Sequence, residues 1–258
     1  IWACIARAGQ AETPVYLRNR VDAEAWIVAL IETEAAAGRR LCLGFDFPFG
    51  YPKGFARALT GADDPLALWT WLRDRLSDTP KGNNRFELAG QINLALGEGR
   101  GPFWFNGLKQ DVDGLARTRA DYHNPFPDRR HAEQIARGAF TCWQMGGAGA
   151  VGGQVMTGLA VLERLRERFA PDVAVWPFDP LDRPVAFVEI WPSLLDPVIK
   201  ARTGPDDIRD AVQVQVVAEA LSSLSPDALG AMLQVDAPEE GWILGLGHEA
   251  ELMAAADP

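Results

Sequence analysis

A strand-like run that ends in an aspartate is the feature of this sequence that most restricts its fold. Residues Arg40–Phe47 read as a buried strand, Leu-Cys-Leu-Gly-Phe, which runs into Asp46. Two strand-like segments precede it, Ile1–Arg7 and Pro14–Arg20, and residues Val21–Gly38 carry apolar side chains at helical spacing. The order strand, strand, helix, strand predicts one mixed α/β sheet with the helix packed across a face.

The rest of the chain continues the α/β pattern and fits one domain spanning residues 1–258. A long segment rich in glycine, aspartate and aromatic residues, Gly97–Asn124, lies within an expected insertion of helices and loops at about residues 52–140. The patterns predict helices at Leu66–Leu76, Phe86–Leu96, Gly152–Phe169, Asp206–Leu224 and Asp227–Leu233, and strands at Asp172–Phe178 and Val185–Trp191.

Charge and composition restrict the partners and the location of the protein. The net charge is −10, which argues against tight, non-specific binding to long nucleic acids. The stretch Gly204–Pro258 holds eleven acidic residues against the single basic Arg209, so a phosphate-bearing ligand would fit the more basic middle of the chain better. No apolar run reaches the roughly 20 residues of a membrane span. Three cysteines in apolar stretches predict reduced core thiols and a cytoplasmic location.

The sequence opens inside the strand-like run at Ile1. We therefore expect the natural chain to continue upstream into a further strand, and we expect that strand to carry an aspartate that lies beside Asp46.

Two acids end or interrupt apolar strands and are the first candidates for chemistry. Asp46 follows a buried strand and precedes Pro48 and Gly50, at the edge where open α/β sheets bind their ligands. The alternative is a carboxylate that only caps the next turn. Glu189 lies within Phe-Val-Glu-Ile-Trp, where a glutamate needs a cation or a donor, and a salt bridge to a buried arginine is an equal alternative.

A third acidic site precedes a helix. Asp207 and Asp210 are three residues apart, which would place both on one face of the first turn. Acids also favour helix N-termini through capping and the helix dipole, so the pair alone does not define a site. Together with Asp46, however, the three carboxylates offer the hard oxygen ligands that Mg²⁺ or Mn²⁺ prefers.

Glycine-rich and arginine-rich motifs are the candidates for substrate contacts. Gly147, Gly149 and Gly152 match G-x-G-x-x-G ahead of a helix, a pattern that can bind an anion at the helix N-terminus. The segment before them is a poor strand, which argues against a dinucleotide-binding turn. Arg85 and Arg130 could bind phosphate or carboxylate, or could belong to a salt-bridged helix surface.

The order of these parts resembles the RNase H-like superfamily. The residues that carry the resemblance are Gly-Phe-Asp46-Phe-Pro-Phe-Gly, Val-Glu189-Ile-Trp-Pro, the late acidic helix, the segment Gly147–Gln154 and the ending Glu239–Gly245. They are similar to an uncharacterised branch whose members are sometimes labelled as molybdopterin-dinucleotide or cobalamin biosynthesis proteins. The resemblance implies that Asp46 is the fourth-strand acid and that Asp207 or Asp210 is a last-helix acid of a two-metal site.

These observations favour a metal-dependent phosphodiester hydrolase, nuclease-like or a degenerate relative, that acts on a nucleotide or a short nucleic acid. Asp46, Asp207 and Asp210 would be metal ligands, with Glu189 in or beside the site. One alternative is a non-hydrolytic nucleotide-binding module in molybdopterin-dinucleotide or cobalamin biosynthesis. The other alternative is a structural or partner-binding domain.

Overall fold

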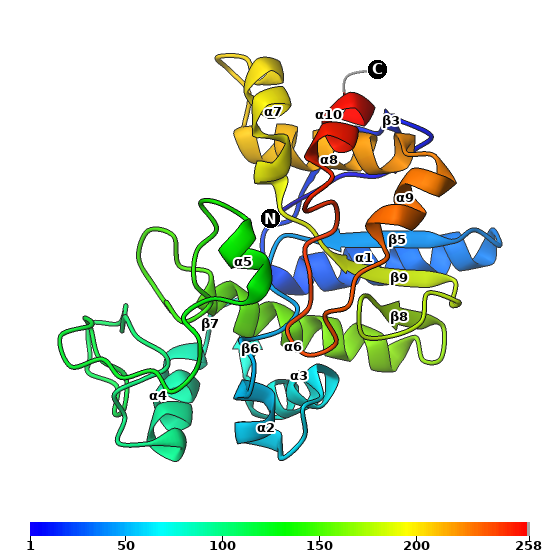
Figure 1. Ribbon diagram of the computed structural model, residues 1–258. Helices are drawn as coiled ribbons and strands as arrows, with labels where there is room; N and C mark the ends of the chain where they lie inside the picture. Colours follow the sequence, from blue (N-terminus) through cyan, green and yellow to red (C-terminus); the bar gives the residue numbers. More distant parts are fainter. Residues whose placement is uncertain (257–258) are drawn as a thin grey trace.

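A parallel three-stranded sheet forms the centre of the molecule. The computed structural model describes residues 1–256 and gives the strand order β5-β9-β8, with β5 at Leu41–Phe45, β8 at Val173–Val175 and β9 at Val185–Glu189. Phe45 is paired with Glu189, so the two strands end together (Figure 1). The register places the residues after Phe45 and the carboxylate of Glu189 at the same edge of the sheet.

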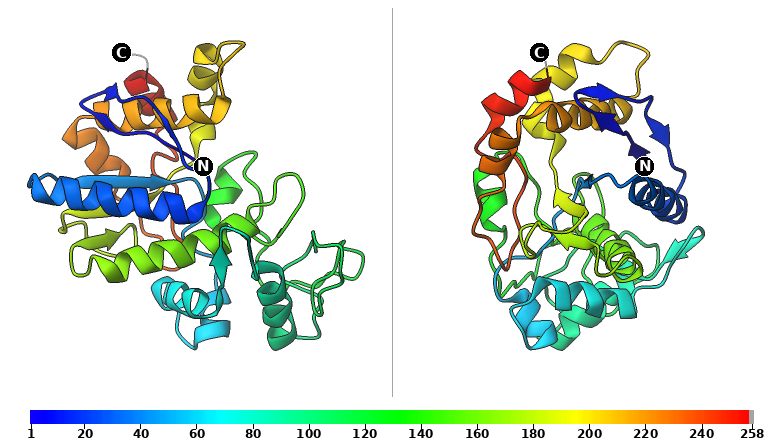
Figure 2. Two further views of the ribbon diagram at one scale, coloured as in Figure 1. Left: turned by 180° about the vertical axis from the view of Figure 1, so that it is seen from behind. Right: turned by 90° about the vertical axis from the view of Figure 1, so that its right-hand side faces the viewer.

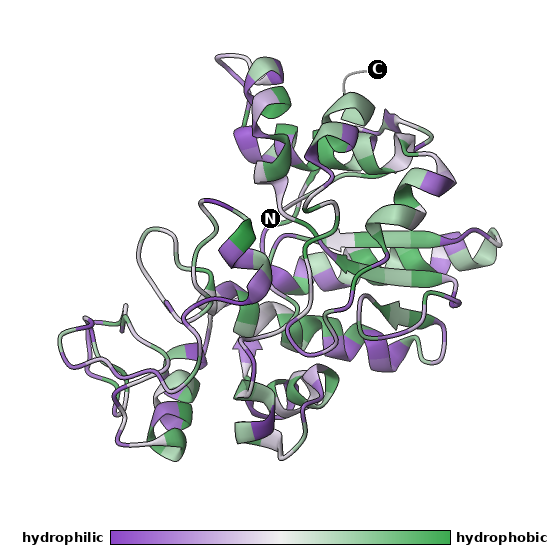
Figure 3. Cartoon of the chain, in the orientation of Figure 1, coloured by the Kyte–Doolittle hydropathy of each residue, from purple (hydrophilic) through white to green (hydrophobic). Residues whose placement is uncertain are grey.

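Helices cover both faces of this sheet (Figure 2). Helices α1 (Arg20–Ala36) and α6 (Gly152–Arg168) share one apolar cluster with Leu43 and Phe187. On the other side, Val188 packs with residues of η1 (Pro192–Leu195), α7 (Asp196–Arg202), α8 (Arg209–Ser223), α9 (Pro226–Met232) and α10 (Glu249–Ala256). The α/β class is therefore confirmed. Figure 3 shows apolar residues gathered in the sheet strands and in the helix faces against them.

Most elements lie where the sequence patterns predicted them. The strands at β5, β8 and β9 and the helices α1, α6 and α9 are confirmed within a few residues, as are α3 (Pro65–Arg75) and α4 (Arg85–Leu96). The late acidic helix α8 begins at Arg209 rather than at Asp206. None of the helices within residues 1–256 is both long enough and apolar enough to cross a membrane.

The N-terminal strands differ from the prediction. Strand β1 (Trp2–Ala3) pairs with β4 (Val15–Tyr16), and β2 (Ala6–Arg7) pairs with β3 (Gln10–Ala11), in two small antiparallel sheets. We call the segment 1–17 the N-terminal hairpin. The prediction that this hairpin and β5 form one sheet is wrong for the described part of the chain, because a cavity separates them.

The segment at about 52–140 packs onto the same core as the sheet. It contains α2 (Phe55–Thr60), α3, the hairpin β6 (Asp78–Thr79) and β7 (Gly82–Asn83), α4 and α5 (His131–Ile135). Residues 97–124 form a long irregular segment whose Phe103 packs against Tyr51, Phe55 and Trp143.

The loop after β5 is fixed to α3 by a buried hydrogen bond. Trp69 Nε1 donates to Phe49 O at 2.7 Å, and both side chains are fully buried. Helix α6 approaches the same loop closely, since a Cβ added to Gly158 would lie 2.5 Å from the Phe47 ring. The position of Asp46 thus depends on α3 and α6.

We expect Trp69→Phe to lower the free energy of unfolding by about 1–3 kcal/mol, because the Phe49 carbonyl would lose its buried donor. Urea denaturation followed by far-UV circular dichroism measures this loss. The control is Trp71→Phe, which changes a partly buried indole two residues further along α3. This substitution should cost less than about 0.5 kcal/mol. Equal losses in the two variants would contradict a specific role of the Trp69 hydrogen bond.

Candidate carboxylate site

Asp46 lies immediately after β5 and lines a cavity of about 830 Å³. The cavity is enclosed by the N-terminal hairpin, α1, β5, α6 and α8. Asp46 is exposed where it lines the cavity, although much of the carboxylate is surrounded by protein. Asp46 is therefore open to a ligand and yet poorly hydrated.

The environment of Asp46 disfavours its charge. Burial, together with the nearby carboxylates of Glu189 and Asp210, raises the pKa of Asp46 to about 6. Within residues 1–256 no cation or hydrogen-bond donor contacts the Asp46 carboxylate. A carboxylate that is desolvated and repelled without a partner is typical of functional sites.

The two acids near α8 have different surroundings. Asp210 lies in the first turn of α8, lines the same cavity as Asp46, and makes no ion pair in the described part of the chain. Asp207 lies in the turn before the helix, where its carboxylate accepts a hydrogen bond from Gly204 N at 2.8 Å. The expectation that both acids share the first helical turn is therefore wrong, because the local turn at Gly204 delays the start of α8.

Glu189 belongs to a buried ion-pair cluster rather than to the cavity. Arg130 Nη1 donates to Glu189 Oε2 at 2.8 Å, and Phe49 N donates to the same oxygen at 2.9 Å. Arg130 also contacts Glu133 and donates to Glu240 O at 2.8 Å, so all five of its side-chain N–H groups have acceptors. Glu189 therefore matches the alternative expected from the sequence, in which it forms a salt bridge with a buried arginine.

The electrostatics of this cluster follow from its burial and its net charge. Burial alone would lower the pKa of Arg130, but the two carboxylates raise it well above its usual range. Burial raises the pKa of Glu189, and Arg130 offsets this only in part because Glu133 shares the guanidinium. Arg130 is fully buried and cannot reach a substrate in this arrangement.

The glycine-rich turn precedes α6 and packs against two aromatic rings. Gly147 and Gly149 have φ of +82° and +73°, which favours glycine, and added Cβ atoms would lie 2.9 and 2.6 Å from Phe105 and Phe140. Gly152 N donates to Gln144 O at 2.9 Å. Close packing explains these glycines, although Gly147 itself is exposed.

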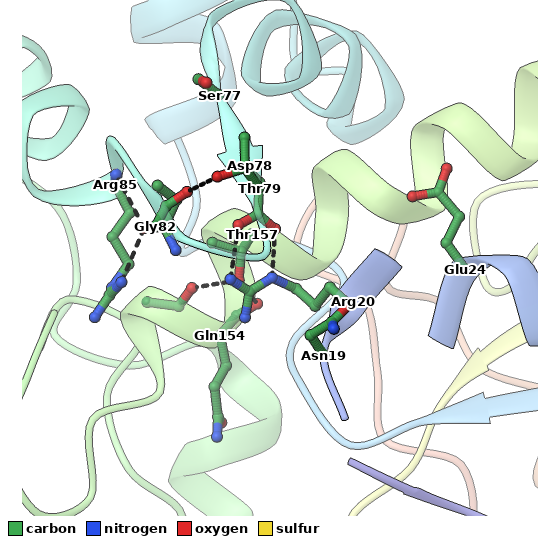
Figure 4. A network of polar contacts seen from close by, with 12 residues as sticks. Asn19, Arg20, Glu24, Ser77, Asp78, Thr79, Gly82, Arg85, Gln154 and Thr157 are labelled. Atoms are coloured by element: carbon green, nitrogen blue, oxygen red, sulfur yellow. Dashed lines mark hydrogen bonds and ion pairs between the residues drawn. The ribbon is translucent and has the colours of Figure 1, made fainter. Parts of the chain in front are cut away.

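Arg85 lies beside the first turn of α6, where an added Cβ at Gly153 would be 3.1 Å from Arg85 Nε. Its guanidinium stacks on Phe86 and donates from Nη1 to Asn83 Oδ1 at 2.8 Å. Burial lowers the pKa of Arg85, and the neighbouring Arg20 lowers it further. Figure 4 shows Arg85 and the Arg20–Asp78 ion pair next to Gln154 and Thr157 of α6.

Sequence reasoning did not single out several polar residues that line the cavity with Asp46. They include Gln154 and Thr157 of α6 and Gln213 of α8. A signal for Gln213 was present, because Asp210 and Gln213 are three residues apart and share a helical face. Among residues 1–256, no group of three or more His, Cys, Asp or Glu side chains could hold a metal ion together.

The cysteines and two acids of the C-terminal segment complete the comparison with the sequence prediction. Cys142 is buried as predicted, whereas Cys4 is half-buried and Cys42 is exposed on β5, and all three are free thiols. Glu239 and Glu240 accept hydrogen bonds from Gly54 N and Lys53 N, which fixes the C-terminal segment to the loop after Asp46.

Comparison with protein families, with characterised proteins and with solved structures finds no match for this chain. The geometry alone therefore supports any proposal about its function.

We expect Arg130→Met to destabilise the protein by about 3–5 kcal/mol, because two buried carboxylates would lose their shared cation. Thermal and urea unfolding measure the loss. The matched control is Arg129→Met, since the side chain of Arg129 makes no ion pair or hydrogen bond within the described residues. A change below about 1 kcal/mol in Arg130→Met would show that the cluster does not support the fold.

The raised pKa of Asp46 predicts a pH-dependent effect of Asp46→Asn. An unfolded aspartate titrates near pH 4, so the stability linked to protonation of Asp46 is complete below that pH and is lost as pH rises through about 6. The stability of Asp46→Asn relative to wild type should therefore be greater at pH 7.5 than at pH 4. The expected increase is about 1 kcal/mol after allowance for the solvent-facing side of the carboxylate.

Urea unfolding of wild-type and variant proteins at pH 4, 5, 6 and 7.5 tests this dependence. Asp182→Asn is the control, because Asp182 is an exposed aspartate that makes no ion pair with the rest of residues 1–256. A stability difference between Asp46→Asn and wild type that stays constant over this range would contradict the raised pKa.

Proposed function

We propose that this chain is a metal-dependent phosphodiester hydrolase of the RNase H-like, nuclease-like kind, or a degenerate relative, in which Asp46 and Asp210 are metal ligands. One observation carries the proposal: two carboxylates, one directly after β5 and one in α8, line one cavity, and neither has a cationic partner within the described residues. The mutual repulsion of the two acids would be relieved by a divalent cation.

The donor set fits Mg²⁺ or Mn²⁺. Such ions prefer hard oxygen ligands, and Mg²⁺ commonly binds through one or two carboxylates while water and substrate phosphate complete its shell. When bound, the ion would activate water and stabilise charge on the departing oxygen. Asp207 and Glu189 contribute less, because each already accepts a hydrogen bond from the protein.

A positive region near α6 supports phosphate as the substrate group. Arg85 stands beside the first turn of α6 and donates only one side-chain hydrogen bond within residues 1–256, and helix N-termini attract anions. Arg20, Gln154 and Thr157 line the cavity that Asp46 also lines (Figure 4). A phosphate held between this region and the carboxylates would span both parts of the site.

The charge of the chain restricts the size of the substrate. A net charge of −10 gives little long-range attraction for a duplex, whose binding depends on many phosphate contacts. A nucleotide or a short nucleic acid places only one or a few phosphates in the cavity. We therefore favour such a substrate, with its phosphodiester near Asp46.

We expect isothermal titration calorimetry to show Mg²⁺ or Mn²⁺ binding that weakens at least about tenfold in Asp46→Asn and in Asp210→Asn, because each removes a ligand oxygen. Asp207→Asn is the matched control and should bind as wild type does, since its carboxylate serves the turn at Gly204. Each titration is done at pH 7.5, above the pKa of Asp46.

Unchanged metal affinity in both Asp46→Asn and Asp210→Asn would contradict the proposed metal site and, with it, the proposed hydrolase activity. Nucleotide binding that persists without metal would instead favour a non-hydrolytic nucleotide-binding module, as in cofactor biosynthesis. Hydrolysis itself is measured by release of nitrophenol from bis(p-nitrophenyl) phosphate, with the same three variants.

A further inference from the structure

The outer edge of β5 borders the cavity beside Asp46. In a parallel pair, successive residues direct their backbone groups to alternate sides. Leu41 N donates to, and Phe45 O accepts from, the residues that flank β9, at 2.9 and 3.0 Å. Cys42 and Gly44 therefore direct their N–H and C=O groups away from β9 and toward the cavity, which both residues line.

This edge offers a hydrogen-bond acceptor next to a donor. The N–H and C=O groups of Cys42 and Gly44 have no hydrogen-bond partner among residues 1–256. Both residues are exposed although they belong to the central sheet. Cys42 O and Gly44 N are thus adjacent on the edge and available to a ligand.

Apolar side chains lie on both sides of the plane of this edge. Helices α1 and α6 cover one face of the sheet, and α8 lies on the other side (Figure 2). A flat group placed edge-on to β5 would therefore contact apolar side chains on both of its faces. These side chains include Trp26 and Leu30 of α1, Val161 and Leu162 of α6, and Val217 and Leu221 of α8.

The charged side chains of the cavity gather at its two ends. At the amino end of β5, Glu34 accepts hydrogen bonds from Arg7 Nη2 and Arg39 Nη2, both at 2.9 Å. At the carboxyl end, polar groups come from the loop after β5 and from the first turns of the three helices. These residues are Arg20, Asp46, Gln154, Thr157, Asp210 and Gln213.

The chemistry of the cavity restricts what could occupy its middle. A hydrocarbon chain would leave the N–H and C=O groups of β5 without partners, and unpaired polar groups are costly to enclose. A sugar alone would place hydroxyl groups against apolar walls. A nucleobase has flat apolar faces and carries donors and acceptors along its edge, which is the combination that this part of the cavity offers.

We propose that the cavity binds the purine base of a nucleotide, with the base edge on Cys42 O and Gly44 N and its faces between α1, α6 and α8. The exocyclic amine of adenine would donate to Cys42 O, and the neighbouring ring nitrogen would accept from Gly44 N. A purine buries more apolar surface than a pyrimidine does. The cavity of about 830 Å³ lies within the range of about 300–1,000 Å³ that small-molecule sites occupy.

The strand also sets the distance between the base and the carboxylates. Each residue of a strand advances the chain by about 3.3 Å, so Gly44 and Asp46 are about 7 Å apart. One sugar spans a comparable length between a base and its phosphate. A base at Gly44 would therefore bring the phosphate to Asp46 and Asp210, at the polar end of the cavity.

The inference rests on the nucleotide substrate of the proposed function and holds for the hydrolase and for the non-hydrolytic module alike. It does not depend on a metal, because the base lies away from the carboxylates. Adenosine, which carries no phosphate, is therefore a suitable probe of the base site in metal-free protein.

Titration of adenosine into the whole metal-free chain, followed through backbone amide resonances, tests the proposal. Gly44 N faces the cavity, whereas Leu43 N faces β9 and is the internal reference. We expect adenosine to shift the Gly44 resonance saturably and to slow exchange of this amide at least about tenfold, with Leu43 unchanged. The riboside of 6-dimethylaminopurine keeps the ring faces but cannot donate to Cys42 O, so it should bind at least about tenfold more weakly.

A matched pair of variants tests the place of the base. Ala218 and Ala211 are both half-buried on α8, and in the described part of the chain Ala218 lines the cavity whereas Ala211 does not. Ala218→Trp should weaken adenosine binding at least about tenfold, because the added indole takes the space of the base, and Ala211→Trp should not. Far-UV circular dichroism checks the fold of both variants, and the two ribosides decide the matter in wild type if Ala218→Trp does not fold.

The proposal would be overturned if adenosine produced no saturable shift of Gly44, or if the two ribosides bound equally well. Unchanged adenosine binding in a folded Ala218→Trp variant would also overturn it. So would a Gly44 amide that is as protected as Leu43 before adenosine is added, because another β-strand would then cover the edge. Adenosine binding without any Mg²⁺ or Mn²⁺ binding would support the base site and contradict only the Asp46–Asp210 metal site, so the two failures are distinguishable.

Discussion

The buried guanidinium of Arg130 connects the parts of this molecule that hold Asp46 in place. It contacts Glu133 of α5, Glu189 at the end of β9 and the carbonyl of Glu240 in the C-terminal segment. Glu189 in turn accepts from Phe49 N in the loop that follows Asp46. Four segments that are far apart in the sequence are thus fixed by one cation, and removing a partner would leave a buried charge without compensation. This cluster makes the carboxyl edge of the sheet rigid.

The two acids of that edge are in opposite situations. Both carboxylate oxygens of Glu189 accept hydrogen bonds, from Arg130 and from Phe49 N, so the side chain connects β9 to its neighbours. Asp46 has no cation within residues 1–256, and burial, together with repulsion from Glu189 and Asp210, raises its pKa. An uncompensated carboxylate opposes folding at neutral pH, and a bound cation would reverse that effect. The contrast between the two acids separates the structural part of this edge from the candidate functional part.

Local patterns predicted the elements, whereas long-range pairing was not predictable from them. The spacing of apolar residues defined α1, α3 and α6, and the apolar run before Asp46 defined β5. Nothing local indicates that Arg130 pairs with Glu189, which lies 59 residues away. The sequence predicted Asp207 within the helix. In the structure its carboxylate accepts a hydrogen bond from Gly204 N in the turn before α8, and no local pattern in the sequence indicates this bond. Asp46 and Asp210 could be identified as candidates from their residue type, but only the fold brings β5 and α8 to one cavity.

The cavity and the carboxylate site depend on each other physically. The cavity gives Asp46 its exposed side, so a ligand that fills the cavity would remove water from that side and raise the cost of the Asp46 charge. Repulsion from Asp210 would then be less screened. Any occupant of the cavity would therefore have to bring a cation, or leave a proton on one of the two acids, to offset their charges.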